Sequence, residues 1–140
     1  MKRVTEEWLK AAKDDLLVIE RIGTEPLLTH MVAFHAQQCI EKSVKAVLEE
    51  HEVGTVRVHN LDRLIELSSD YLSLDIDIVT IEKLDKLYID SRYPGDLGLL
   101  PDGKPTTKDS EEFSELAKGV YETVKSYLTG QLSKNRPENA

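Results

Sequence analysis

The chain has 140 residues, the usual length of one domain, and 40% of them are hydrophobic and 31% charged. This composition excludes a wholly disordered chain, and no stretch approaches the ~18 uninterrupted apolar residues that a membrane-spanning helix requires. With 26 acidic against 18 basic residues the net charge is −8, which argues against nonspecific nucleic-acid binding over a broad surface.

An apolar stripe predicts a first helix over residues 5–21. Its members recur at spacings of three and four: Trp8, Ala12, Leu16 and Ile19. Gly23 ends this helix, and Pro26 allows a new one to start, since proline is tolerated in a first turn. The second predicted helix covers residues 27–51 and has the longest apolar face, formed by Ala33, Ala36, Ile40, Val44, Val47 and Leu48.

Two shorter helices are predicted next. Asn60 is the expected N-cap of the third helix. The residues on one side of that helix are Leu61, Leu64, Ile65, Ser68 and Leu72. The fourth is predicted over residues 77–91, and Pro94 closes it because the residue before a proline avoids the helical region.

Residues 93–108 hold three prolines and three glycines and are predicted to form a loop. We expect this loop to pack down through Leu97, Leu99 and Leu100. The last helix is expected to have Thr107 or Asp109 as its N-cap, with Asp109 and Glu112 at capping-box spacing, and to end at Leu128.

The predicted architecture is therefore an all-α, antiparallel up-and-down bundle of about five helices over residues 1–128. A polar segment over residues 129–140 is expected to be a flexible tail. The N-terminal residues lead into no apolar signal segment, and a single cysteine, Cys39, excludes an internal disulfide. Both features favour a cytoplasmic protein.

Several large enzyme classes lack their usual motifs in this chain. It has no Gly-rich phosphate loop, no His-Glu-x-x-His and no cysteine pair. His30 and His35 are five residues apart, so they do not share the helix face that ligands at i and i+4 would share. We expect no metal site and no cofactor.

A polar strip on the second helix is one candidate binding element. Gln38, Lys42 and Lys45 share a face at i, i+4 and i+7. The strip is either a solvated charged face or an anion-binding surface, in which the lysines contact phosphate and the amide contacts a base or sugar.

Two helix ends supply further candidates. His59 and Asn60 stand at a helix start, where they either cap the helix or help its free N–H groups to bind an anion. Arg92 at the end of the fourth helix either complements the helix dipole or, aimed by the turn at Pro94, holds a phosphate or stacked base beside Tyr93.

Four segments in this order resemble the HEPN domain ("higher eukaryotes and prokaryotes nucleotide-binding"). They are Trp8 with residues 14–16, then residues 36–46, 59–61 and 88–94. The resemblance covers roughly residues 4–128. It implies an antiparallel helix bundle, often a homodimer. Many prokaryotic members are partners of a minimal nucleotidyltransferase encoded beside them, and others are RNases of toxin–antitoxin or defence systems.

HEPN RNases carry an arginine followed four to six residues later by a histidine, and this chain lacks that pair. No histidine stands at that spacing after Arg21, Arg57, Arg63 or Arg92. The resemblance therefore favours a dimeric module that binds a nucleotide or RNA phosphate, or docks a nucleotidyltransferase. Its expected contacts are Gln38, Lys42 and Lys45 on one wall, with His59, Arg92 and Tyr93 opposite.

Two alternatives remain. A metal-independent RNase could use His59 as the base and Arg92 as the phosphate stabiliser, taken from different helices. In the other, the chain is a helical dimer whose polar strip supports only assembly.

Overall fold

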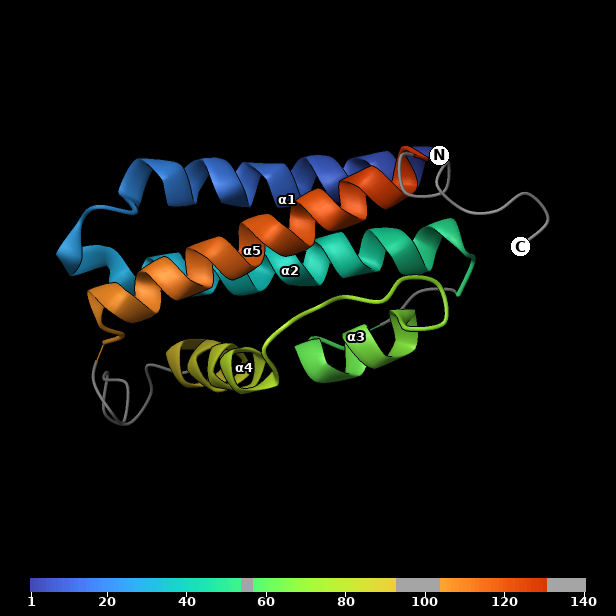
Figure 1. The fold of residues 1–140 in the computed structure, drawn as a ribbon. Helices are drawn as coiled ribbons and strands as arrows, with labels where there is room; N and C mark the ends of the chain where they lie inside the picture. Colours follow the sequence, from blue (N-terminus) through green and yellow to red (C-terminus); the bar gives the residue numbers. More distant parts are fainter. Residues whose placement is uncertain (54–56, 93–103, 131–140) are drawn as a thin grey trace.

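The computed structural model describes residues 1–53, 57–92 and 104–130, with residues 88–92 described by their backbone alone. These residues form five α-helices and one 3₁₀ turn, and this confirms the all-α prediction (Figure 1). In chain order the elements are α1 (Arg3–Ile22), η1 (Pro26–Leu28), α2 (Thr29–Glu50), α3 (Leu61–Ser68), α4 (Ile78–Arg92) and α5 (Thr107–Leu128).

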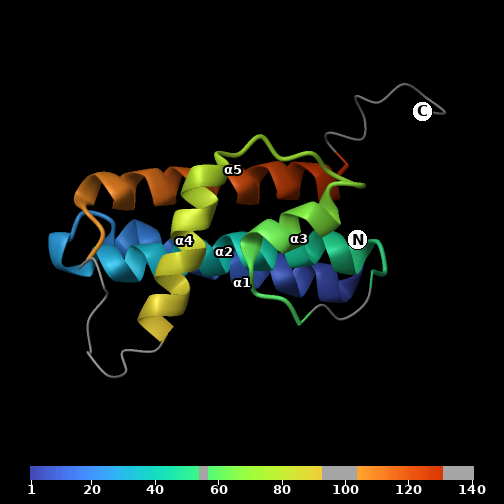
Figure 2. The same ribbon diagram turned by 90° about the horizontal axis from the view of Figure 1, so that it is seen from below.

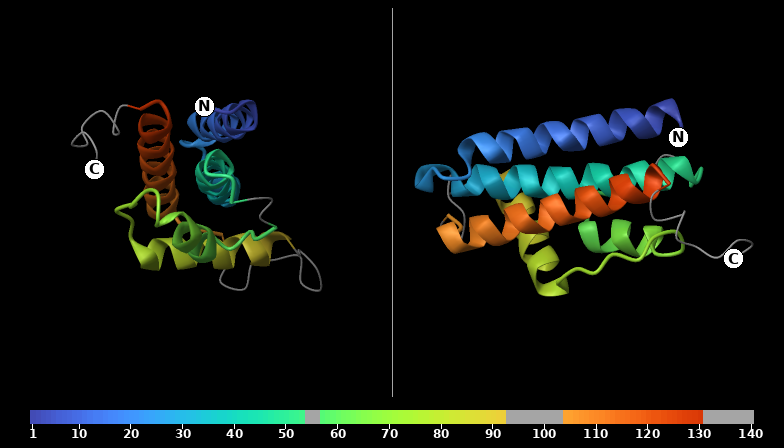
Figure 3. Two further views of the ribbon diagram at one scale, coloured as in Figure 1. Left: turned by 90° about the vertical axis from the view of Figure 1, so that its right-hand side faces the viewer. Right: turned by 45° about the horizontal axis from the view of Figure 1, so that its top comes forward.

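Helix α2 is the centre of the bundle and contacts each of the other α-helices. Helix α1 runs antiparallel to it on one side, and α5 lies against it in the same direction as α2 (Figure 1). Helices α3 and α4 cover the opposite side of α2, and α4 lies across the long helices rather than along them (Figures 2 and 3).

The core lies where the long helices meet. The whole apolar face predicted for α2 is buried, including Ile40 and Val44 at 0% exposure. On α1 the predicted stripe is also buried from Ala12 to Ile19, while Trp8 is partly buried at its edge. Burying such side chains stabilises a fold by roughly 1.5–3 kcal/mol each, so these two stripes fix how α1 and α2 pack.

Two predicted boundaries differ from the structure. The helix expected from residue 27 begins as the 3₁₀ turn η1, and α2 starts at Thr29. The third helix ends at Ser68, so Leu72 lies beyond it. The hydroxyls of Ser68 and Ser69 donate to the carbonyls of Ile65 and Glu66, and such local bonds compete with continuation of a helix.

The predicted N-cap of α5, Thr107 or Asp109, was wrong by one or three residues. Thr106 is the N-cap, and its hydroxyl accepts from the N–H of Asp109 at 3.0 Å. The Asp109 carboxylate accepts in return from the N–H of Thr106 at 3.0 Å. The capping box thus joins Thr106 to Asp109 instead of Asp109 to Glu112, because a threonine at this position can accept the orphan N–H of the first turn.

The leucines of the predicted loop, Leu97, Leu99 and Leu100, lie outside the described residues, as does the predicted tail from residue 131 onward. Within the described ranges, no helix is long and apolar enough to cross a membrane.

The capping box gives a direct test of the α5 start. Thr106→Ala should lower the free energy of unfolding by about 1 kcal/mol, because one first-turn N–H loses its acceptor. The neighbouring Thr107→Ala is the matched control, and it should change stability by less than about 0.5 kcal/mol. Urea denaturation of both variants measures the difference, and an equal loss in the two would contradict the assignment.

Candidate functional site

Two nearly buried carboxylates each join a lysine of α2 to a histidine. The first is Asp15 of α1, whose side chain is 7% exposed. Its Oδ1 lies 2.8 Å from the Nδ1 of His35, and its Oδ2 accepts from the Nζ of Lys42 at 2.9 Å. This group ties α1 to α2.

The second carboxylate is Glu41 of α2, also 7% exposed. Its Oε2 accepts from the Nζ of Lys45 at 2.9 Å and lies 3.1 Å from the Nδ1 of His59. Its Oε1 accepts from the amide of Gln37 at 3.2 Å. Because a carboxylate only accepts, Nδ1 of His59 is the donor, and in a neutral ring the lone pair is then on Nε2.

His59 is the exposed member of these two groups. Its side chain is 51% exposed, compared with 20% for His35. The amide of Gln37 also donates to the main-chain carbonyl of His59 at 3.1 Å, so both the ring and the backbone of His59 are held. The structure therefore presents an oriented imidazole at the surface, just before α3.

The N–H groups at the start of α3 donate to acceptors within the protein itself. Asn60 accepts from the N–H of Arg63 at 3.1 Å, which confirms it as the N-cap. The N–H of Leu61 donates to both oxygens of Asp85 on α4, each at 3.0 Å. The carboxylate of Asp85 thus occupies the place that we expected an external anion to take.

Asp85 is buried at 8% exposure, and its ionisation reflects two opposing effects. Burial raises its pKa above the ordinary value, and the hydrogen bonds from the first turn of α3 partly offset this. Glu41 and Asp62 add a smaller effect in the raising direction, because like charges disfavour a second ionised carboxylate.

The predicted strip on α2 is arranged differently from either expectation. Lys42 and Lys45 each pair with a buried carboxylate, and Lys45 is itself only 7% exposed. The ammonium of Lys45 also lies 5.6 Å from the centre of the Trp8 ring. Gln38 donates to the side chain of Gln37 at 2.7 Å. The positive charges of this strip are therefore largely compensated inside the protein.

The other predicted wall is described in part. Helix α4 ends at Arg92, but the Arg92 side chain and all of Tyr93 lie outside the described residues. The C-terminal end of the α4 backbone lies on the same side of the bundle as the segment leading into α3 (Figures 2 and 3).

Two other chemistries find no support in the described residues. Cys39 is fully buried, and burial raises its pKa to about 12, so it supplies no thiolate nucleophile at neutral pH. No group of three or more His, Cys, Asp or Glu side chains in those residues could hold a metal ion.

The buried acids Asp15, Glu41 and Asp85 were not among the predicted site residues. A signal for two of them is present in the sequence. Asp15 falls within the apolar stripe of the first helix, between Ala12 and Ile19, and Glu41 continues the buried row from Gln37. A charged residue at a core position of a helical pattern indicates a buried, paired charge.

Comparison with known proteins agrees with this architecture. The model of the HEPN domain family matches residues 5–127. A protein of Methanocaldococcus jannaschii named "Putative toxin MJ1304" is 33% identical over an alignment of 133 positions, and the match covers 86% of this chain and 86% of the other. The crystal structure of ST0689, described as an archaeal HEPN homologue, is similar with a TM-score of 0.65 and 29% identity. That match covers 90% of this chain and 98% of the other.

The raised pKa of Asp85 predicts a pH dependence of stability. In the folded state Asp85 binds its proton more tightly than in the unfolded state, so its contribution to the free energy of unfolding is largest at low pH. It declines as the pH rises from the ordinary aspartate pKa of 3.8 through the raised pKa of the folded state. Relative to Asp85→Asn, the wild-type protein should therefore lose stability across this window.

Urea denaturation of both proteins between pH 3.5 and pH 7, values chosen around the ordinary aspartate pKa of 3.8, measures this difference. Asp70→Asn removes an exposed carboxylate and controls for the change in net charge. A difference that grows in favour of the wild type as the pH rises would contradict the assignment.

Proposed function

The chain belongs to the HEPN domain family, and on this basis we propose that it is a cytoplasmic, toxin-like member that binds a phosphate of a nucleotide or RNA. We place it as the partner of a minimal nucleotidyltransferase in a two-gene module of the toxin–antitoxin kind. The name of the M. jannaschii relative and the segments that resemble the family support this assignment.

The observation that carries the proposal is the oriented imidazole of His59. The hydrogen bond between Nδ1 and Glu41 fixes the orientation of the ring, and its Nε2 edge is exposed to solvent. A group held in this way loses little conformational entropy when it contacts a ligand. When Nε2 also carries a proton, this edge of the ring can donate a hydrogen bond to a phosphate oxygen, and in an acidic chain such a donor is a local site for a phosphate.

The proposed contacts are His59, Arg92 and Tyr93, on the side of the bundle where α4 ends. The N–H of Leu61 takes no part, because Asp85 accepts its hydrogen bond. Lys42 and Lys45 have a different role in this proposal from the one expected from sequence. Lys42 and Lys45 neutralise the charges of Asp15 and Glu41, and Gln38 donates a hydrogen bond to Gln37. The strip thus stabilises the residues that position His59 and does not contact the phosphate. A homodimer would present two such sites.

Arginine and lysine should differ at position 92. Arg92→Lys should weaken binding of nucleotide or RNA by about 1–3 kcal/mol, because an ammonium cannot reproduce the bidentate contact of a guanidinium. Isothermal titration with a panel of nucleoside mono-, di- and triphosphates and a short single-stranded RNA measures the change.

The matched control is Arg21→Lys, the same exchange at an exposed site on α1. His59→Gln should also weaken binding while leaving the urea midpoint close to that of the wild type. Titrations that cannot be distinguished among the wild type, Arg92→Lys and His59→Gln would end the proposal.

A metal-independent RNase is the second candidate, and the same Glu41–His59 pair favours it. With Nδ1 donating to a carboxylate, Nε2 is the basic nitrogen that could accept a proton from a 2′-hydroxyl. Arg92 would then stabilise charge on the phosphate.

Cleavage of RNA decides between the two candidates. For a binding protein, we expect the wild type and His59→Ala to degrade single-stranded RNA at the same background rate in the presence of EDTA. Gel analysis of a labelled substrate measures both rates. Cleavage by the wild type that disappears in His59→Ala would place the RNase ahead of the binding function.

A further inference from the structure

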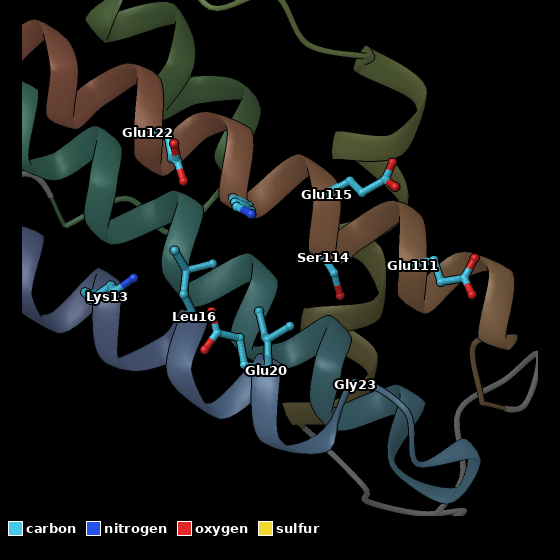
Figure 4. A pocket seen from close by; sticks show the side chains of 10 residues that line it. Lys13, Leu16, Glu20, Gly23, Glu111, Ser114, Glu115 and Glu122 are labelled. Carbon is cyan, nitrogen blue, oxygen red and sulfur yellow. The ribbon is translucent and has the colours of Figure 1, made fainter.

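A groove runs between α1 and α5, on a different side of the bundle from His59. Both helices pack on α2, but they diverge toward the C-terminal end of α1 (Figure 1). At this wide end the groove holds a cavity of about 340 Å³ (Figure 4). Leu16 and Ile19 of α1 line it together with charged side chains of both helices.

The groove continues past the wide end. Two further hollows, of about 520 Å³ and 310 Å³, lie between the same helices toward the start of α1. Their charged lining is mixed, with Lys10, Lys13 and Lys125 beside acidic residues, so the acidic rim is confined to the wide end. The 20 residues of α1 span ~30 Å, so the groove is as long as a helix of five turns.

The groove has an apolar floor and an acidic rim at its wide end. Leu16 lies between the two helices, with Glu20 on α1 and Glu122 on α5 beside it (Figure 4). The rim carries four glutamates against two lysines, Lys13 and Lys118. Across the described part of the chain none of these glutamates, Glu20, Glu111, Glu115 and Glu122, forms an ion pair.

The charge of this lining favours some binding partners over others. At the wide end four glutamates outnumber two lysines and repel a phosphate backbone, so this end does not suit a nucleic acid. A second copy of the chain carries a net charge of −8, so it complements the acidic rim less well than a basic helix does.

We propose that the groove between α1 and α5 docks an amphipathic helix of a partner protein. The apolar side chains of that helix fill the hollow over Leu16 and Ile19, and its lysines or arginines face Glu20, Glu111 and Glu115. An amphipathic helix laid in a groove is a common mode of peptide recognition. The site is independent of the proposed phosphate contacts at His59 and Arg92.

The test uses two synthetic helical peptides of about 18 residues, ~27 Å long, with leucines at i, i+3, i+4 and i+7. One carries lysines beside the leucines and the other carries glutamates. Fluorescence anisotropy measures the affinity of each peptide for the full chain. The lysine peptide should bind at least tenfold more tightly, and it should shift the methyl NMR signals of Leu16 and Ile19.

Charge reversal in the protein sharpens the test. The triple variant Glu20→Lys, Glu111→Lys and Glu115→Lys should reverse the preference between the peptides. The matched control reverses three exposed acids outside the groove, Asp70→Lys, Asp75→Lys and Glu82→Lys, and should leave the preference unchanged. Circular dichroism and urea denaturation identify any variant that fails to fold.

Three results would overturn the proposal. The first is equal affinity of the two peptides, and the second is an equal response of the groove variant and the control variant. The third is a change in oligomeric state of the triple variant without peptide, measured by sedimentation, since this would assign the groove to a second copy of the chain. None of these results bears on the nucleotide titration of Arg92→Lys.

Discussion

The buried carboxylate of Glu41 is the interaction on which the α3 side of the molecule depends. It lies on the central helix and joins three groups: Lys45 on its own helix, Gln37 one turn away, and His59 from the segment before α3. Removing a charge of this kind leaves its partners unpaired in a poorly hydrated place, which costs more than the pair itself contributes. The chain entering α3 is therefore held by Glu41 together with Gln37, which donates to the carbonyl of His59.

Asp15 repeats this arrangement on the other side of α2, and the comparison shows what distinguishes a supporting group from a candidate site. Each acid bonds a lysine and the Nδ1 of a histidine. His35 is mostly covered, whereas half of the His59 side chain is in solvent. The chemistry is the same in both groups, and accessibility alone makes His59 the residue that a ligand could contact.

Most of the fold could be predicted from the sequence because the apolar stripes are long and regular. The face from Ala33 to Leu48 identified α2 and its buried side, and Asn60 identified the start of α3. The ends were harder to place, because serine hydroxyls at Ser68 and Ser69 and a threonine at Thr106 act through local hydrogen bonds that periodicity does not register.

The candidate site was predictable only in part. Sequence spacing placed Lys42 and Lys45 on a shared face, but it could not show that Asp15 of α1 accepts from Lys42 and that Glu41 accepts from Lys45. These partners depend on how the helices pack. His59 was identified by its position before a helix, and its orientation by Glu41 required the tertiary structure.

The contact between Asp85 and the N–H of Leu61 has a consequence for local motion. A helix of eight residues is too short to persist alone in water, so α3 remains helical because it is docked. One of its first amides is protected by a carboxylate from α4 rather than by its own turn. Hydrogen exchange at the Leu61 amide will therefore report the separation of α3 from α4.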